Sequence, residues 1–106
     1  MANREQVKAY LQAVREKIVG GWCQNAPARN DAGQEVHIDD PSATRVCLVT
    51  AIYQTVPEAD LDSVYAPIMS VCGIVKQFQL VDWNNDPERT KDRVLKMLDQ
   101  ALEKVA

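Results

Sequence analysis

The sequence lacks the features that several protein classes require. Its 12 lysine and arginine residues are outnumbered by 15 aspartate and glutamate residues, which gives a formal net charge of −3. It therefore has no basic excess with which to coat nucleic acid. It also lacks an apolar run of the roughly 20 residues that cross a bilayer, and its start does not resemble a signal peptide. We expect a soluble cytoplasmic protein that binds neither nucleic acid nor a membrane.

Cysteine and histidine are scarce as well. Cys23, Cys47 and Cys72 are odd in number and widely spaced, and His37 is the single histidine. This spacing fits neither a disulfide framework nor the close cysteine pairs of a zinc site. We expect free thiols, with Cys47 and Cys72 buried as small apolar side chains, and we expect neither a metal nor a cofactor.

What is present favours helices. The chain has 106 residues, of which 46% are hydrophobic, enough for one domain with a single core. Most apolar positions recur at helical spacing. The sequence predicts a single, mainly α domain over residues 1–106, a compact bundle of four to five helices around a buried second helix. A short β-hairpin or ordered loop is expected between the first two helices.

The first helix is the best defined of these elements. Asn3 is a suitable N-cap, Gln6 completes a capping-box variant, and Gly20 follows the last apolar position near Val19. The apolar stripe that should face the core consists of Val7, Leu11, Val14 and Ile18.

Beyond the first helix the helical period disappears. Turn-forming residues gather from Asn30 to Gly33, and Val36 and Ile38 then alternate with His37. This pattern favours a short β-hairpin, and an irregular loop is the alternative because such short strand arms are marginal by themselves.

The second helix is expected to span Pro41 to Val56. Asp40 is a suitable cap and Pro41 fits the first helical position. The residues from Val46 to Tyr53 are apolar nearly all round, which favours a buried helix over the alternative of a buried strand. Part of this apolar surface is also compatible with self-association.

Two further helical series complete the chain. One runs from Ala59 to about Leu80, where Pro67 predicts a kink or two short helices that meet near Ala66. The other ends near Val105 and begins after a cap at either Asp86 or Thr90.

Two clusters of aromatic and amide residues stand out, one after the first helix and one before the last. In a helical bundle these junctions can meet at one pole and form a small-ligand pocket or a protein interface. The alternative is structural: the indoles plug the core and the polar groups satisfy exposed backbone. The candidate binding residues are Trp22, Gln24, Asn25, Trp83, Asn84, Asn85, Asp86, Arg89 and Thr90.

The same clusters carry a family resemblance. The segments Gly-Trp-Cys-Gln at 21–24, Asp-Pro-x-Ala at 40–43 and Trp-Asn-Asn-Asp-x-x-Arg-Thr at 83–90 resemble a family of small bacterial and phage proteins of unknown function. The resemblance covers about residues 5 to 105. It implies no activity, but it implies a setting, that of an accessory protein in the bacterial cytoplasm or on a mobile element.

The sequence contains few residues that could form a catalytic site. Cys23 is the candidate nucleophile, His37 the candidate base, and Asp39 or Asp40 the orienting acid of a cysteine-dependent hydrolase. No glycine pair that would form an oxyanion hole follows Cys23. We therefore expect no catalysis.

The function expected from the sequence is binding. We expect a small non-catalytic accessory protein, phage-associated, that binds a host macromolecule as a modulator or defence inhibitor. The partner is expected to be a protein. A small-molecule or nucleotide-binding module with its pocket at the Trp22 and Trp83 pole is the alternative, and a homo-oligomer is also open.

Overall fold

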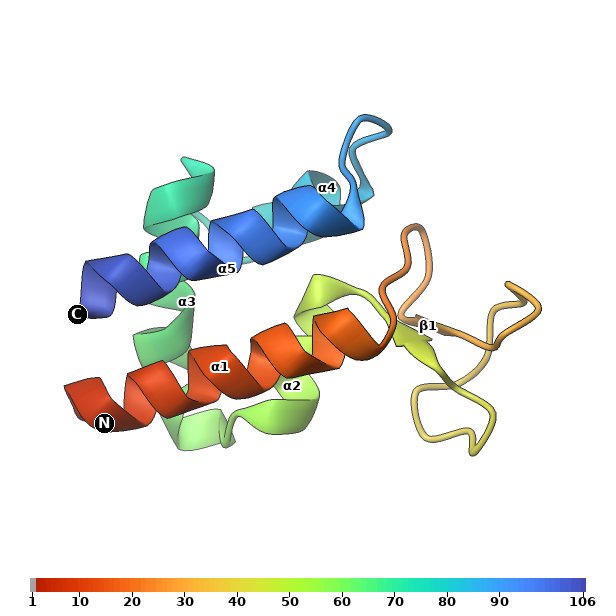
Figure 1. Cartoon of the computed structure of the whole chain (residues 1–106), viewed down its shortest axis with the longest axis horizontal. Helices are drawn as coiled ribbons and strands as arrows, with labels where there is room; N and C mark the ends of the chain where they lie inside the picture. The colour runs from red at the N-terminus through yellow and green to blue at the C-terminus, as the bar shows by residue number, and fades with distance from the viewer. Residues whose placement is uncertain (1) are drawn as a thin grey trace.

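A computed structural model describes residues 2–106, and this part of the chain is mainly helical (Figure 1). A 3₁₀ turn, η1 (Glu58–Asp60), precedes the third helix, and strands β1 (Ala28–Arg29) and β2 (Arg45–Val46) lie between the first two helices. The α-helices are α1 (Arg4–Gly20), α2 (Leu48–Thr55), α3 (Leu61–Cys72), α4 (Gln79–Asn85) and α5 (Lys91–Val105). The predicted fold class is confirmed.

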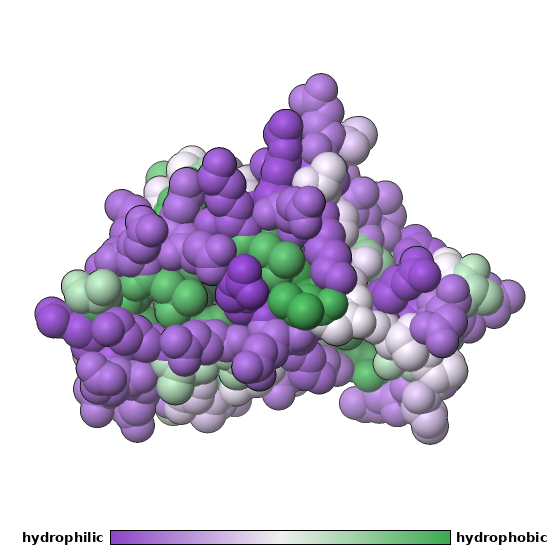
Figure 2. Space-filling model, in the orientation of Figure 1, coloured by the Kyte–Doolittle hydropathy of each residue, from purple (hydrophilic) through white to green (hydrophobic). Residues whose placement is uncertain are grey.

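The two longest helices, α1 and α5, lie side by side and run in opposite directions, so that both termini are at one end of the molecule (Figure 1). Figure 2 shows this face, where hydrophilic side chains cover most of the surface and a hydrophobic seam runs between the two helices. Arg15 on α1 and Asp99 on α5 form an ion pair at 2.7 Å. This pair joins the two helices at the surface.

The N-terminal half of the bundle follows the sequence pattern closely. The Asn3 side chain accepts the backbone N–H of Gln6, and the Gln6 side chain accepts the backbone N–H of Asn3, both at 2.9 Å. This is the predicted capping box. The predicted stripe of α1 is buried in the core, together with residues of α2, α3, α4 and α5, among them Leu48, Ile52, Val64, Ile68, Leu80, Val94, Met97 and Leu98.

The antiparallel strand pair is confirmed, although its second strand comes later than the Val36 and Ile38 arm that we expected. Ala28 pairs with Val46 and Arg29 with Arg45. The predicted turn at 30–33 also forms, and an isolated bridge joins Arg29 to Glu35. Val46 takes the place of the expected arm in the second strand because it makes a further backbone bond. Its N–H donates to the carbonyl of Gly21, and this bond holds the end of α1 against the sheet.

The predicted start of the second helix is wrong. The Asp40 side chain accepts the N–H of Ser42 at 2.8 Å and forms a local turn rather than a helix cap. The chain is then extended through β2, and α2 begins only after Cys47, whose sulfur accepts the N–H of Thr50. The predicted end at Val56 is confirmed.

The third series breaks at a glycine and not at the proline. α3 continues through Pro67 to Cys72, so the alternative of two short helices that meet near Ala66 is wrong. Gly73 has a φ of +72°, a left-handed conformation that suits glycine and ends the helix. A new helix, α4, then includes Trp83 and Asn84, which the sequence placed in a junction.

The last helix begins at the later of its two predicted caps. Thr90 caps α5, and its side chain accepts the N–H of Arg93 at 3.2 Å. The preceding residues form the tight turn, in which Arg89 N–H donates to the Asp86 carbonyl at 2.8 Å. Among residues 2–106, no helix has the length and apolarity needed to traverse a bilayer.

Candidate functional site

The two aromatic and amide clusters meet at one pole of the bundle. The Trp22 indole, just after α1, donates from Nε1 to Oδ1 of Asn84 on α4 at 2.8 Å. The expected proximity of the two clusters is therefore observed. The contact joins residues that are 62 positions apart in the chain.

Asn84 is the centre of this pole. It is 1% exposed, and its Oδ1 accepts the Trp22 indole and also the backbone N–H of Leu48 at 3.0 Å. Its Nδ2 donates to the Cys23 carbonyl at 3.2 Å and to Oδ1 of Asn85 at 3.0 Å. One buried amide thus links the segment after α1, the start of α2, and α4.

The neighbouring amides extend the same network. Gln24 donates from Nε2 to the carbonyls of Asn84 at 2.9 Å and Asp86 at 2.7 Å. Asn25 has a φ of +63°, and its backbone N–H donates to Oδ1 of Asn85 at 2.8 Å. These bonds hold the segment 22–25 against the end of α4.

The arginine of the second cluster is also used internally. The Arg89 guanidinium stacks on the Trp83 ring, 3.8 Å from its centroid, and Nε donates to the Trp83 carbonyl at 2.9 Å. The Asp86 side chain accepts the N–H of Glu88, and Thr90 caps α5. The polar groups of Asn84 and Thr90 thus stabilise the backbone, as the structural alternative expected. Arg89, which that alternative paired with a carboxylate such as Asp86, instead contacts Trp83.

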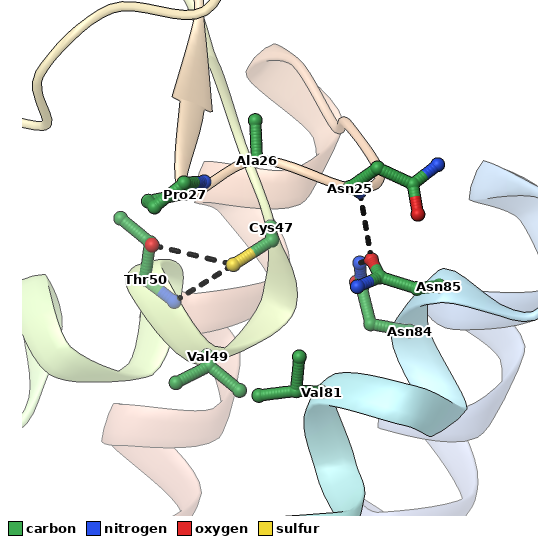
Figure 3. A pocket seen from close by; sticks show the side chains of 9 residues that line it. All are labelled: Asn25, Ala26, Pro27, Cys47, Val49, Thr50, Val81, Asn84 and Asn85. Atoms are coloured by element: carbon green, nitrogen blue, oxygen red, sulfur yellow. Dashed lines mark hydrogen bonds between the residues drawn. The ribbon is translucent and has the colours of Figure 1, made fainter.

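A cavity of about 460 Å³ opens beside this network. Figure 3 shows the Val49 and Val81 side chains facing each other across it, with the amides of α4 on one side and the Cys47 and Thr50 pair on the other. No charged side chain of residues 2–106 lines it. Its lining residues are Asn25, Ala26, Pro27, Cys47, Val49, Thr50, Val81, Asn84 and Asn85.

A second cavity of about 620 Å³ adjoins the first, because Pro27, Val49 and Thr50 line both. Tyr53 lines the second cavity and is 68% exposed. Val81 of α4 lines the first cavity together with Val49 and is 46% exposed. Phe78, the cap residue of α4, is 69% exposed.

The two cavities connect three of these side chains, since Val49 and Val81 line the first and Val49 and Tyr53 line the second. Val49 and Tyr53 are one turn apart on α2, and Phe78 and Val81 are one turn apart on α4. We call Val49, Tyr53, Phe78 and Val81 the α2/α4 patch. Large apolar side chains exposed together mark binding surfaces more often than isolated ones do.

The sequence did not identify the α2/α4 patch. It assigned Val49 and Tyr53 to a buried helix whose apolar surface was in part compatible with self-association, and it placed Phe78 in an apolar helical series without singling it out. The available signal was the apolar character of α2 all round its circumference, which exceeds what its neighbours cover. α2 buries Leu48, Ala51 and Ile52 completely but leaves Tyr53 in solvent.

The residues of the enzymatic alternative do not form an activated pair. Cys23 is buried, and its thiol faces the Ala26 carbonyl at 3.5 Å. Burial raises the pKa of the Cys23 thiol to about 11, whereas a catalytic cysteine has a lowered pKa. His37 is largely exposed and lies 3.7 Å from Asp39.

The burial of the cysteines differs from the prediction. Cys23 is buried, while Cys47 and Cys72 are each only partly covered. The prediction for Cys47 and Cys72 was wrong because Cys47 caps α2 beside a cavity and Cys72 ends α3. All three are free thiols, and no group of three or more metal-ligating side chains occurs among residues 2–106.

We expect Cys23 to react slowly with iodoacetamide at pH 8. A rise in pKa from 9.0 to about 11 lowers the thiolate fraction at this pH by roughly a hundredfold, and burial slows attack further. The rate should rise about tenfold per pH unit up to pH 10, because the folded-state pKa lies above this range. Peptide mass spectrometry after timed labelling measures the rate of Cys23 alkylation, and the protein unfolded in guanidinium is the control. Labelling of folded Cys23 as fast as in guanidinium would contradict this prediction.

Comparisons with known proteins identify the family of the chain. Neither the curated proteins nor the solved structures include a match to it. A family model does match, and it covers nearly the whole of the described chain, including both clusters and the α2/α4 patch. Because this model matches residues 2–104, the chain belongs to the family described as a family of unknown function (DUF6197).

Proposed function

We propose that the chain is a non-catalytic accessory protein that acts by binding a partner protein through the α2/α4 patch. The observation that carries this proposal is the exposure of Tyr53 and Val81, which line two adjoining cavities on either side of Val49. Phe78 is also exposed, one turn before Val81. Tyrosine is among the residues enriched in interface hot spots, and Tyr53 lies beside a cavity.

The hydrogen bonds that hold α2 and α4 together support the proposal. The Asn84 network fixes α4 relative to the start of α2 through buried hydrogen bonds. A surface held in this way loses little conformational freedom when a partner binds. The setting we propose is the one that the family resemblance implied, a phage-associated protein in the bacterial cytoplasm that modulates a host process or inhibits a defence protein.

A second candidate function is supported by the first cavity. Its volume of about 460 Å³ lies within the range of about 300 to 1,000 Å³ that is usual for small-ligand pockets. Its uncharged lining, with amides of Asn25 and Asn85 at the rim, favours a neutral ligand over a nucleotide phosphate. The pocket differs from the one predicted around Trp22 and Trp83, because neither indole lines it and only Asn25, Asn84 and Asn85 of the candidate binding residues do.

Photo-crosslinking tests the proposed function. A benzophenone amino acid replaces Tyr53 in one variant. In a control variant it replaces Val19, which is exposed on α1. Both variants are expressed in the cells that naturally contain the chain. We expect position 53 to capture a specific protein, and we expect Val81→Ser to abolish this capture. Val19→Ser is the matched control, since Val19 and Val81 are 48% and 46% exposed.

The outcomes separate the two candidate functions. Capture that survives Val81→Ser, or equal capture from position 19, would contradict binding through the α2/α4 patch. A rise of several degrees in the melting temperature with one neutral small molecule, and no captured protein, would favour the second candidate instead.

A further inference from the structure

The charges around the α2/α4 patch are predominantly acidic. Glu35 lines the second cavity beside Tyr53, and Glu58 lines a smaller hollow that also includes Tyr53. Asp82 follows Phe78 by one helical turn, on the same side of α4. All three carboxylates are exposed.

Basic side chains are few in the same region. Among residues 2–106, no lysine or arginine lines the two cavities or the smaller hollow. His37 lines the second cavity, and Lys76 lies 5.9 Å from the centre of the Phe78 ring.

We propose that the segment of the partner protein that occupies the α2/α4 patch is basic and amphipathic, with apolar side chains for the two cavities and lysine or arginine beside them. This inference rests on the proposed function, since it specifies the partner at the same site. An amphipathic helix that places its apolar face in a groove is a common form of such a segment. Opposite charge at the rim favours the encounter and disfavours acidic competitors.

The same charges disfavour the other occupants. A symmetric dimer places the same patch on both subunits, so Glu35, Glu58 and Asp82 of two copies would face one another. An anionic lipid surface would be repelled for the same reason. The partner segment is therefore expected to come from a different protein, with charge of the opposite sign.

Three synthetic peptides of about 18 residues, or five helical turns, test the inference. They share one leucine stripe and carry lysine, glutamate or glutamine at the other positions. Fluorescence anisotropy measures their binding to the full chain at low and at physiological salt. We expect the lysine peptide to bind most tightly, the glutamate peptide most weakly, and the difference to shrink as salt is added.

Two triple variants with the same charge change locate the effect. The patch variant is Glu35→Gln/Glu58→Gln/Asp82→Asn, and the control variant on α1 and α5 is Glu5→Gln/Glu16→Gln/Glu103→Gln. We expect the patch variant to bind the lysine peptide roughly three- to tenfold more weakly. The control variant should change affinity by less than about twofold, since distant exposed charges are screened.

Each contrary outcome overturns a defined statement. Three results would contradict the inference that the partner segment is basic. They are an equal loss of affinity in both triple variants, equal binding of the three peptides, and no binding of the lysine peptide at about 1 mM. The proposed function is tested separately by photo-crosslinking. If position 53 still captures a partner protein in cells, binding through the α2/α4 patch remains supported even when the peptides contradict a basic partner. A dimer in sedimentation velocity that Tyr53→Ser removes would identify a second copy as the occupant and overturn the inference as well.

Discussion

Replacement of Asn84 by leucine is expected to lower the free energy of unfolding by about 3 to 5 kcal/mol. Leucine has a similar volume, but it leaves the indole N–H of Trp22, the N–H of Leu48 and the carbonyl of Cys23 without their present partner in a buried site. Each buried group left unpaired costs about 1 to 3 kcal/mol. Urea titration followed by tryptophan fluorescence measures the loss, since Trp22 reports on the same contact.

Two further variants define what this experiment means. Gln100→Ala replaces an exposed amide on α5 and should stay within about 0.5 kcal/mol of the parent. Asn84→Asp keeps an acceptor for Trp22 and Leu48, but at neutral pH it places a carboxylate opposite the Cys23 carbonyl. It should therefore also be less stable than the parent, since the Cys23 carbonyl loses its N–H donor. A loss below 1 kcal/mol for Asn84→Leu would show that this amide does not hold the pole together.

The elements predicted correctly are those that local chemistry determines. Asn3 and Gln6 form the capping box within three residues of each other, and the stripe of α1 needs only the helical period. Thr90 likewise caps α5 through its own side chain. Such features are readable from sequence because donor and acceptor are neighbours in the chain.

The errors arise where distant segments compete with a local signal. Asp40 and Pro41 form a good helix start by themselves, yet Val46 pairs with Ala28 and bonds to Gly21, and this non-local pairing keeps the chain extended. Similarly, Asn84 and its indole partner Trp22 were both candidates for binding a ligand. Their hydrogen bond to each other could not be assigned from residues so far apart in sequence.

The α2/α4 patch illustrates a different limit. A helix that is apolar all round is normally buried all round, and α2 has too few neighbours in this small bundle for that rule to hold. The exposed side chain of Tyr53 is therefore visible only once the packing of α2 against α1 and α4 is known. A sequence can indicate an excess of apolar surface, whereas the fold decides where this surface is exposed.

Substitution of Gly21 by alanine is expected to destabilise the protein by about 2 to 3 kcal/mol. A Cβ atom at this position would overlap the backbone carbonyl oxygen of Thr44 and lie 3.2 Å from the Cα of Arg45. The Gly21 backbone is extended, so the penalty comes from this close approach and not from its dihedral angles. Relief requires β2 to move away, which breaks the bond from Val46 N–H to the Gly21 carbonyl, now 3.0 Å long.

The adjacent glycine provides a control that differs by one position. Nothing lies within 4 Å of a Cβ atom added at Gly20, the last residue of α1, and alanine is favoured over glycine in a helix by up to about 1 kcal/mol. Gly20→Ala should therefore unfold at the same urea concentration as the parent or a higher one, and Gly21→Ala at a lower one. Equal midpoints for the two variants would mean that β2 can move without cost. In that case the contact between α1 and the sheet would not position Trp22 for its bond to Asn84.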